Sequence, residues 1–286
     1  MSDFRNPEKM ILCSATIIPQ PVKPQPGELL AQIYAAKKAG FAGISMWAFH
    51  EMVECIAGRS SEQTQSDLRD ASIAVPLVET IMPWDVATAA EAVSTAKPIF
   101  ESCKLFGAHS VAAVSLSSES IAEQKAVSHL RAVCELADEY GLTVVTEFLP
   151  WSGIPTLASL ANILAKVDCD NAGIVLDAWH WQRQPGGPSP DVLREIKPQQ
   201  LSVFQLCDAA ANAEADPIDE CMHRRLLPGG GVIDFAEIFS LFDEIGANPL
   251  IAPEVFNEQQ SALGADIMAV NIYRSSAKVL SNTETF

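Results

Sequence analysis

The stretch Gly173–Trp181 reads Gly-Ile-Val-Leu-Asp-Ala-Trp-His-Trp and joins an apolar run to an acid and then to a histidine. Consecutive apolar residues indicate a strand that is buried on both faces, as in a parallel sheet. An ionised carboxylate at the end of such a strand is unfavourable unless a cation or hydrogen bonds compensate its charge. We therefore expect Asp177 either to cap a helix that follows the strand or to belong to a charged site.

Short apolar segments alternate with amphipathic segments along the whole chain. The predicted strands are Ile11–Ile17, Gly43–Trp47, Val75–Thr80, Ser110–Ser115, Thr143–Phe148, Gly173–Asp177, Leu201–Leu206 and Leu250–Val255. The predicted helices are Glu28–Ala39, Gln63–Ala71, Ala89–Leu105, Ile121–Tyr140, Leu157–Lys166, Asp191–Ile196, Phe235–Ile245 and Ala265–Leu280. This alternation predicts an α/β protein, a single (β/α)8 TIM barrel, whose one domain covers residues 1–286.

The spacing of the strands supports the barrel. Successive predicted strands start 28 to 35 residues apart, except for the last two, which start 49 residues apart. A barrel of roughly 250 residues has about 31 residues in each strand–helix unit. The extra residues lie in Asp208–Gly231, after the seventh strand, and such an insertion is expected on the face where barrel active sites form. A doubly wound open sheet is the alternative, but no Gly-x-Gly-x-x-Gly follows the first strand.

Composition limits the class of protein. A net charge of −17 repels phosphate backbones, so we do not expect nucleic acid as a partner. The sequence has no apolar run of the roughly 18 residues that a membrane span needs, and its start lacks a signal-peptide apolar region. Seven scattered cysteines without Cys-x-x-Cys spacing indicate reduced thiols that mostly fill the core. We therefore expect a cytoplasmic protein with no membrane partner. The composition is compatible with both a monomer and a homo-oligomer.

Polar side chains end several of the predicted strands: Glu79, Glu147, Asp177, Gln205 and Glu254. In a barrel these strand ends meet at one mouth, where convergent carboxylates repel one another unless their charge is compensated. A divalent cation would compensate it, and the oxygen atoms of Glu147, Asp177, Gln205 and Glu254 suit Mg2+ or Mn2+ better than zinc. Each of these acids, taken alone, could instead cap a helix or form a structural ion pair. For Glu79, such a structural role and a role in the site are balanced.

Other residues near the expected mouth are candidates for contact with a substrate. His180 lies three positions after Asp177, where a substrate contact and a structural role are both reasonable. Trp47 follows the second strand and would either line a pocket or pack in the core. Arg224 and Arg225 precede Leu-Leu-Pro-Gly-Gly-Gly, and either arginine could reach a substrate oxygen or lie in solvent.

This pattern resembles a known family. The residues that carry the resemblance are Glu147, Asp177-x-x-His180, Gln205 with Asp208, Arg225-x-x-Pro-Gly-x-Gly and Glu254. They look like the xylose isomerase-like TIM barrels, and more narrowly the sugar phosphate isomerase/epimerase group, with its tagatose 3-epimerase-like, hydroxypyruvate isomerase-like and inosose dehydratase-like enzymes. In that family a Glu, Asp, His, Glu set binds Mn2+, Mg2+ or Co2+, and the two glutamates exchange the substrate proton. The resemblance implies that Glu147 and Glu254 are both metal ligands and acid–base groups, and that His180 and Arg225 hold substrate oxygens.

The sequence departs from the family pattern at two positions. The histidine of the seventh strand is Gln205 here, whose amide oxygen is a weaker ligand that prefers harder cations. A second glutamate that the family's epimerases carry after the fifth strand would fall at Gly153, which weakens the assignment as a ketose epimerase. His50 and His109 do not match the additional histidines of the related endonuclease IV branch.

We therefore expect a metal-dependent isomerase or epimerase of a sugar, polyol or keto-sugar, in which a carboxylate moves an α-proton through a metal-stabilised enediolate. Return of the proton to the other face gives epimerisation, and return to the neighbouring carbon gives isomerisation. Loss of a β-hydroxyl instead gives dehydration, so a lyase of the inosose dehydratase type is the runner-up. A non-catalytic barrel that binds a polyol or serves as an assembly subunit is the second alternative.

Overall fold

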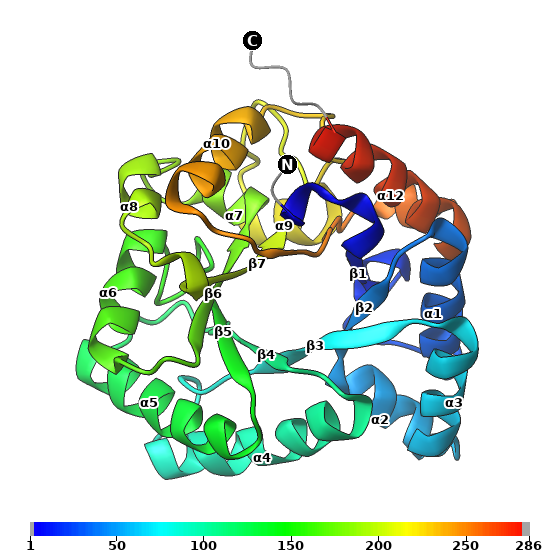
Figure 1. Cartoon of the computed structure of the whole chain (residues 1–286), viewed down its shortest axis with the longest axis horizontal. Coiled ribbons are helices and arrows are strands. Elements are labelled where there is room, and N and C mark those ends of the chain that lie inside the picture. Colours follow the sequence, from blue (N-terminus) through cyan, green and yellow to red (C-terminus); the bar gives the residue numbers. More distant parts are fainter. Residues whose placement is uncertain (1–2, 282–286) are drawn as a thin grey trace. The chain divides into compact units, whose positions relative to one another are not determined.

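The computed structural model describes residues 3–281 of the chain (Figure 1). Eight strands form one sheet in the order in which they occur along the sequence. This strand order is that of a (β/α)8 barrel and confirms the predicted fold class. The strands are β1 (Ile11–Cys13), β2 (Gly43–Trp47), β3 (Ala74–Ile81), β4 (Ser110–Ala113), β5 (Thr143–Glu147), β6 (Ala172–Asp177), β7 (Leu201–Gln205) and β8 (Leu250–Ile251).

Helices connect the strands, as parallel pairing requires. The α-helices are α1 (Glu28–Ala39), α2 (Ala48–Ile56), α3 (Ser61–Ala71), α4 (Ala89–Phe106), α5 (Glu123–Glu139), α6 (Leu157–Val167), α7 (Ala178–Arg183), α8 (Pro190–Arg194), α9 (Pro217–His223), α10 (Phe235–Ile245), α11 (Glu258–Ser261) and α12 (Ala265–Ser281). Short 3-10 helices are η1 (Asp3–Arg5), η2 (Pro7–Lys9), η3 (Ser14–Ile17) and η4 (Pro198–Gln200). Within residues 3–281, every helix is too short or too polar to span a bilayer.

The contacts of the chain divide it into two compact units. Unit 1 contains the residues up to Pro76, Gln205–Ala236 and the residues from Leu250 onwards. Unit 2 contains Leu77–Phe204 and Glu237–Pro249. The single domain that the sequence predicts stays a prediction.

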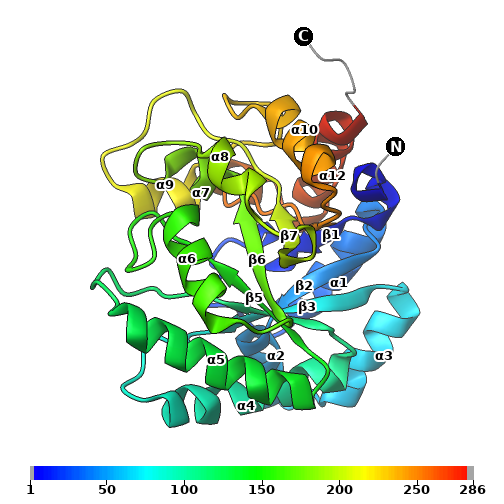
Figure 2. The same ribbon diagram turned by 60° about the vertical axis from the view of Figure 1, so that its left-hand side comes forward.

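Unit 1 packs helices α1 and α12 side by side (Figures 1 and 2). The ring of Phe41, just after α1, meets Tyr273 of α12 edge to face, with 5.1 Å between the ring centroids. Gly40 ends α1 at a φ of 99°, a conformation that glycine adopts without steric cost. The backbone N–H of Cys13 donates to the carbonyl of Pro253 over 3.1 Å, so the chain after β8 lies beside the first strand.

Unit 2 has a core of fully buried strands and closely packed helices. Every residue of β4 and of β6 is buried. Helices α4, α5 and α6 follow one another along this unit (Figures 1 and 2). Phe204 on β7 packs edge to face on Phe239 and Phe242 of α10, with ring centroids 6.1 and 5.2 Å away. Such aromatic pairs each stabilise a core by about 0.5–1.5 kcal/mol beyond their buried area.

The structure corrects the predicted ends of the first and last strands. β1 ends at Cys13 rather than Ile17, because the chain turns into η3, where the Thr16 hydroxyl donates to the Cys13 carbonyl over 2.9 Å. β8 ends at Ile251 rather than Val255. Both errors have the same cause, since burial continues past the end of each strand and does not distinguish a strand from other buried backbone. Helices α2, α7 and α9, which follow strands β2, β6 and β7, were not predicted.

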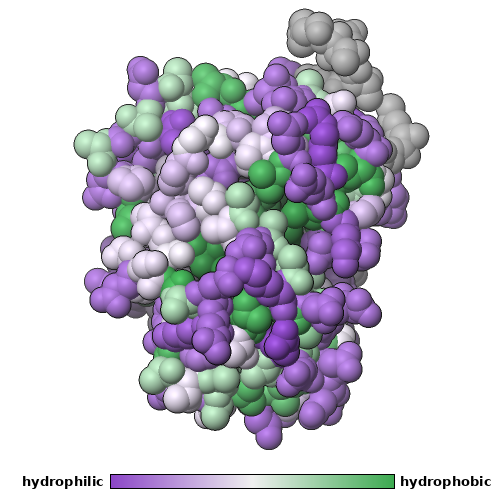
Figure 3. All heavy atoms as spheres, turned by 90° about the vertical axis from the view of Figure 1, so that its left-hand side faces the viewer, coloured by the Kyte–Doolittle hydropathy of each residue, from purple (hydrophilic) through white to green (hydrophobic). Residues whose placement is uncertain are grey.

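The surface that Figure 3 shows is mixed in hydropathy. Figure 3 shows one face of the molecule, over which hydrophilic residues are spread with smaller groups of hydrophobic residues between them.

Candidate functional site

Three buried side chains of unit 1 meet at the carboxylate of a fourth, Glu254. We call the four the Glu254 cluster: Cys13, Gln205, Arg225 and Glu254. The Cys13 thiol donates to Oε1 of Glu254 over 3.2 Å, and the Gln205 amide nitrogen donates to the same oxygen over 3.0 Å. Nη1 of Arg225 lies 3.2 Å from the other oxygen, Oε2. Both oxygens of this buried carboxylate are therefore contacted, as a buried charge requires.

The ends of strands position this cluster. Cys13 is the last residue of β1 and Gln205 is the last residue of β7. Glu254 follows β8, and its backbone N–H donates to the carbonyl of Leu206 over 3.2 Å. The backbone of three strand ends thus fixes the positions from which these side chains reach one another.

The structure distinguishes between the two adjacent arginines. Arg225 is 1% exposed, and its guanidinium also donates to the carbonyl of Cys221 over 2.9 Å and lies over the ring of Phe256, 5.4 Å from its centroid. Arg224 is exposed and pairs with Asp219 over 3.0 Å. Arg225 is therefore the arginine that points towards Glu254, and its role in holding a substrate oxygen stays a prediction.

Asp208 shapes the glycine-rich loop that follows Arg225. Its buried carboxylate accepts the backbone N–H groups of Ala209, Gly229, Gly231 and Ile233 over 2.8 to 3.0 Å. A Cβ atom on Gly231 would lie 2.5 Å from Oδ1 of Asp208, so this position needs a residue without a side chain. Asp208 therefore acts on the loop, and this explains why the acid and the glycines occur in one sequence pattern.

Three buried side chains of unit 2 form a second group, the His180 cluster: Glu147, Asp177 and His180. One ligand atom of each lies within 4.8 Å of the others. Nε2 of His180 is 3.2 Å from Oε1 of Glu147. Glu147 is the last residue of β5 and pairs in register with Val175 on β6, two residues before Asp177.

Asp177 is a helix cap as well as a member of the His180 cluster. Its Oδ1 accepts the backbone N–H of His180 over 2.8 Å and so begins α7. His180 consequently lies in the first turn of a short helix rather than in a loop. The helix-cap interpretation is confirmed for one oxygen of Asp177, and the metal-ligand interpretation stays a prediction.

Aromatic rings surround His180. Trp151 and Trp179 meet the imidazole edge to face with centroids 5.5 and 5.4 Å away, and Phe148 lies at 6.5 Å. These rings keep water from the imidazole and restrict its orientation. Glu79 is also buried in unit 2, on β3, and its predicted contact with a substrate is still untested.

The donor atoms of the two clusters suit a divalent cation. Oε1 of Gln205 is buried and has no hydrogen-bond partner in the described structure. A buried acceptor without a partner costs about 1–3 kcal/mol, and a cation would compensate it. In unit 2 the His180 cluster offers two carboxylates and an imidazole. Carboxylate, amide and imidazole groups are all ligands of divalent metals in proteins.

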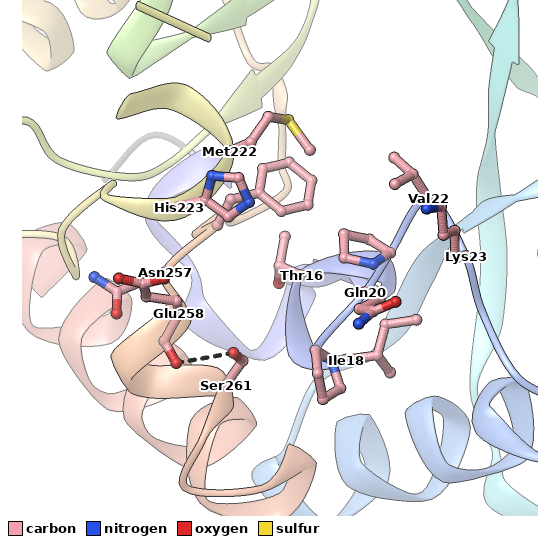
Figure 4. Close-up of a pocket in the computed structure, with 13 residues that line it drawn as sticks. Thr16, Ile18, Gln20, Val22, Lys23, Met222, His223, Asn257, Glu258 and Ser261 are labelled. Carbon is pink, nitrogen blue, oxygen red and sulfur yellow. Dashed lines mark hydrogen bonds between the residues drawn. The ribbon is translucent and has the colours of Figure 1, made fainter. Parts of the chain in front are cut away.

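A pocket of about 530 Å³ lies beside the Glu254 cluster in unit 1 (Figure 4). Met222 and His223 come from α9, and Lys23 comes from the segment before α1. Phe256 lines the pocket, and the guanidinium of Arg225 lies over its ring. This phenylalanine therefore contacts both the pocket and the Glu254 cluster. The pocket thus combines apolar walls with groups that can donate and accept hydrogen bonds.

Trp47 and His50 support the same part of unit 1. The ring of Trp47 is 5.9 Å from that of Phe256, and its indole N–H is buried without a hydrogen-bond partner in the described structure. Nε2 of His50 is 2.8 Å from the carbonyl of Pro21, a pocket residue, and the other ring nitrogen is 3.1 Å from Gln32. Burial of the imidazole lowers the pKa of His50, and the hydrogen bond to Pro21 partly opposes this shift.

The family model for xylose isomerase-like TIM barrels matches residues 33–282. The chain belongs to this family. Among its relatives, the inosose isomerase of Bacillus subtilis (strain 168) is 26% identical over 198 residues, which are 67% of this chain and 69% of that relative. This xylose isomerase-like barrel therefore shares about two thirds of its length with a relative of that name.

Solved structures share the fold of this xylose isomerase-like barrel. A crystal structure of the IOLI protein with a bound zinc atom has a TM-score of 0.82 and 20% identity, and the match covers 97% of this chain and 99% of that one. The probable 3-DHS dehydratase AsbF from Bacillus anthracis has a TM-score of 0.72 and 18% identity, over 96% of this chain and 99% of that one. These matches confirm the family's fold over nearly the whole chain.

Cys13 is the residue that the sequence did not single out. The cysteines were interpreted mostly as core filler, and the predicted first strand ran past Cys13 to Ile17. A strand that ended at Cys13 would have placed the thiol with the polar residues at the other strand ends. The position of a strand end is therefore the signal that was missing.

Proposed function

We propose that this xylose isomerase-like barrel is an isomerase or epimerase of an inosose or a related keto-polyol or keto-sugar. The observation that carries the proposal is the buried carboxylate of Glu254, held at Oε1 by Cys13 and Gln205 and at Oε2 by Arg225. The relatives that are named inosose isomerase support the substrate class.

The proposal includes a divalent cation held by Glu147, Asp177, Gln205 and Glu254. These residues end or follow strands β5, β6, β7 and β8, and the carboxyl ends of barrel strands share one face. The unpartnered Gln205 oxygen supports this assignment, because a turn of the amide by about 180° would present that oxygen to Glu254. When bound, such a cation would polarise a substrate carbonyl and stabilise negative charge on its oxygen.

Glu254 is proposed to take the α-proton of the substrate and to return it. A nearby guanidinium and hydrogen bonds favour the ionised form of a carboxylate, which is the form that accepts a proton. Arg225 also fixes the direction of the carboxylate, because it holds one oxygen through a buried contact. Proton transfer by a positioned carboxylate contributes about 10²–10⁴ in rate.

Glu147 is proposed as the second acid–base group. Nε2 of His180 lies 3.2 Å from its Oε1, and Trp151 and Trp179 pack against the imidazole and restrict its orientation. His180, Arg225, Glu79 and Trp47 are proposed to contact the substrate. The pocket of Figure 4 would take the part of the substrate that lies away from the reacting carbons.

The test is an NMR assay of product formation. The purified protein is incubated with a divalent cation and with a panel of inososes and ketoses. We expect isomerisation or epimerisation of at least one substrate, and loss of that activity in Glu147→Gln but not in Glu139→Gln, an exposed glutamate at the end of α5. Elimination of water would instead assign a lyase, and no conversion across the panel with metal bound would contradict the proposal.

A further inference from the structure

We propose that the thiolate of Cys13 is itself a metal ligand and that it gives the site a preference for Zn2+ or Co2+ over Mg2+ and Mn2+. This inference rests on the metal site of the proposed function and goes beyond it, because the proposed ligand set contains only oxygen atoms. Cys13 is fully buried at the end of β1, and its sulfur lies 3.2 Å from Oε1 of Glu254.

The distance between the two atoms suits ligands of one ion. Zinc lies about 2.3 Å from sulfur ligands and about 2.0–2.2 Å from carboxylate oxygens. With tetrahedral angles, these bond lengths place the sulfur and the oxygen about 3.6 Å apart. The observed 3.2 Å therefore needs an adjustment of only a few tenths of an ångström, which is within side-chain reach without movement of β1.

The amide of Gln205 is a second observation. Its nitrogen donates to the same oxygen of Glu254 that Cys13 contacts, and its own oxygen is buried without a partner in the described structure. The nitrogen and oxygen of an amide exchange places when the group turns by about 180°. After this turn the amide oxygen would face Glu254 Oε1 and the sulfur, and a cation would make that arrangement favourable.

The sulfur of Cys13 would replace the histidine ligand that the family pattern has on the seventh strand. Gln205 occupies the position of a histidine in the family pattern, so the set loses its one nitrogen ligand there. A thiolate is a softer ligand than an imidazole and favours zinc over magnesium or manganese. Coordination needs the deprotonated thiol, so binding would release the proton of Cys13 to solvent.

The other cysteines of unit 1 near this site have different partners. The sulfur of Cys207 is 3.5 Å from Nη1 of Arg225, and that of Cys221 is 3.0 Å from Nη2. In the Glu254 cluster, the sulfur of Cys13 contacts the carboxylate of Glu254. Cys13 is therefore the thiol to test.

The experiment is a titration of metal-depleted full-length protein with Co2+, followed by absorption spectroscopy. We expect a sulfur-to-cobalt charge-transfer band in the near ultraviolet, which Cys13→Ser loses. The matched control is Cys103→Ser, a buried cysteine of α4 in unit 2, which should keep the band. Competition with a chelator should show that Cys13→Ser binds Zn2+ at least about tenfold more weakly, since even the partners of ligands change metal affinity about 10–100-fold.

X-ray absorption at the zinc edge tests the same inference on the unaltered protein. We expect a sulfur neighbour at about 2.3 Å from the zinc. Stoichiometric metal with only oxygen and nitrogen neighbours and no charge-transfer band would overturn the role of Cys13 and leave the proposed metal site in place. Failure to bind any divalent cation would overturn the metal site of the proposed function together with this inference.

Discussion

Nη1 of Arg225 lies 3.2 Å from Oε2 of Glu254, and both side chains are almost completely buried. The positive charge of Arg225 and the negative charge of Glu254 compensate each other, because neither group is hydrated by bulk water. The pair also couples the insertion after β7, which carries the arginine, to the residue that we propose as acid–base group.

Arg225→Ala should lower the free energy of unfolding by about 3–5 kcal/mol, because it leaves the buried carboxylate of Glu254 without its cation. The neighbouring Arg224→Ala is the control, since Arg224 is exposed and its surface pairs contribute about 0–1 kcal/mol. Urea unfolding of both variants measures the difference. Equal losses in the two variants would contradict the assignment of Arg225 as the buried partner.

Asp177 allows its structural role to be separated from its proposed chemical role. Asn caps a helix about as well as Asp, whereas Ala does not, so Asp177→Asn should be about 1 kcal/mol more stable than Asp177→Ala. Both variants lack the carboxylate charge, so both should lose the metal. Unfolding curves and metal analysis give the two readouts, and metal retained by either variant would argue against Asp177 as a ligand.

The barrel and the positions of several polar residues could be predicted from the sequence, because the spacing of the strands indicates the fold and a polar residue after a buried apolar run indicates a strand end. Glu147, Asp177 and Gln205 do end their strands and Glu254 follows the end of β8, whereas the roles of these residues in a site stay predictions. The spatial pairing of Arg225 with Glu254 could not be predicted, because the resemblance singles out Arg225 over Arg224 only as a substrate contact and says nothing of a carboxylate partner. That choice is made by the backbone of the insertion, where Arg225 N–H donates to the carbonyl of Phe256 over 3.0 Å.

Asp208→Asn should destabilise the protein by about 2 kcal/mol or more. The carboxylate accepts two backbone N–H groups at each of its oxygens, and an amide nitrogen in place of one oxygen would face two donors. The control is Asp266→Asn, because Asp266 pairs with Lys38 at the surface and should contribute about 0–1 kcal/mol. A loss for Asp208→Asn no larger than that of the control, measured by urea unfolding, would contradict this role.

Acidification should weaken the fold through His50. Its pKa is lowered in the folded state, so below the ordinary histidine value of 6.5 the unfolded chain takes up a proton that the folded protein resists. The stability is therefore fully present above pH 6.5 and is lost as the pH falls towards the folded pKa. In urea unfolding between pH 7.5 and 5, His50→Gln should lose less stability than the unaltered protein, and identical slopes would exclude His50 as a cause.

The limits of prediction at Cys13 and at the strand ends have one physical origin. The apolar run Ile11–Ile17 is buried throughout, but only its first three residues are a strand, because hydrogen bonds of Ser14 and Thr16 turn the rest into η3. Hydrophobicity reports burial and does not report where the backbone leaves the sheet. The role of a residue at a strand end therefore needs the structure.

The most direct measurement is the exchange of substrate hydrogen in deuterated water, followed by NMR. With metal and an inosose or related ketone, we predict that the C–H next to the carbonyl exchanges for deuterium. Glu254→Gln should slow this exchange by about 100-fold or more, because it removes the group that carries the proton. Substrate conversion without deuterium incorporation, or exchange at an unchanged rate in Glu254→Gln, would contradict the account.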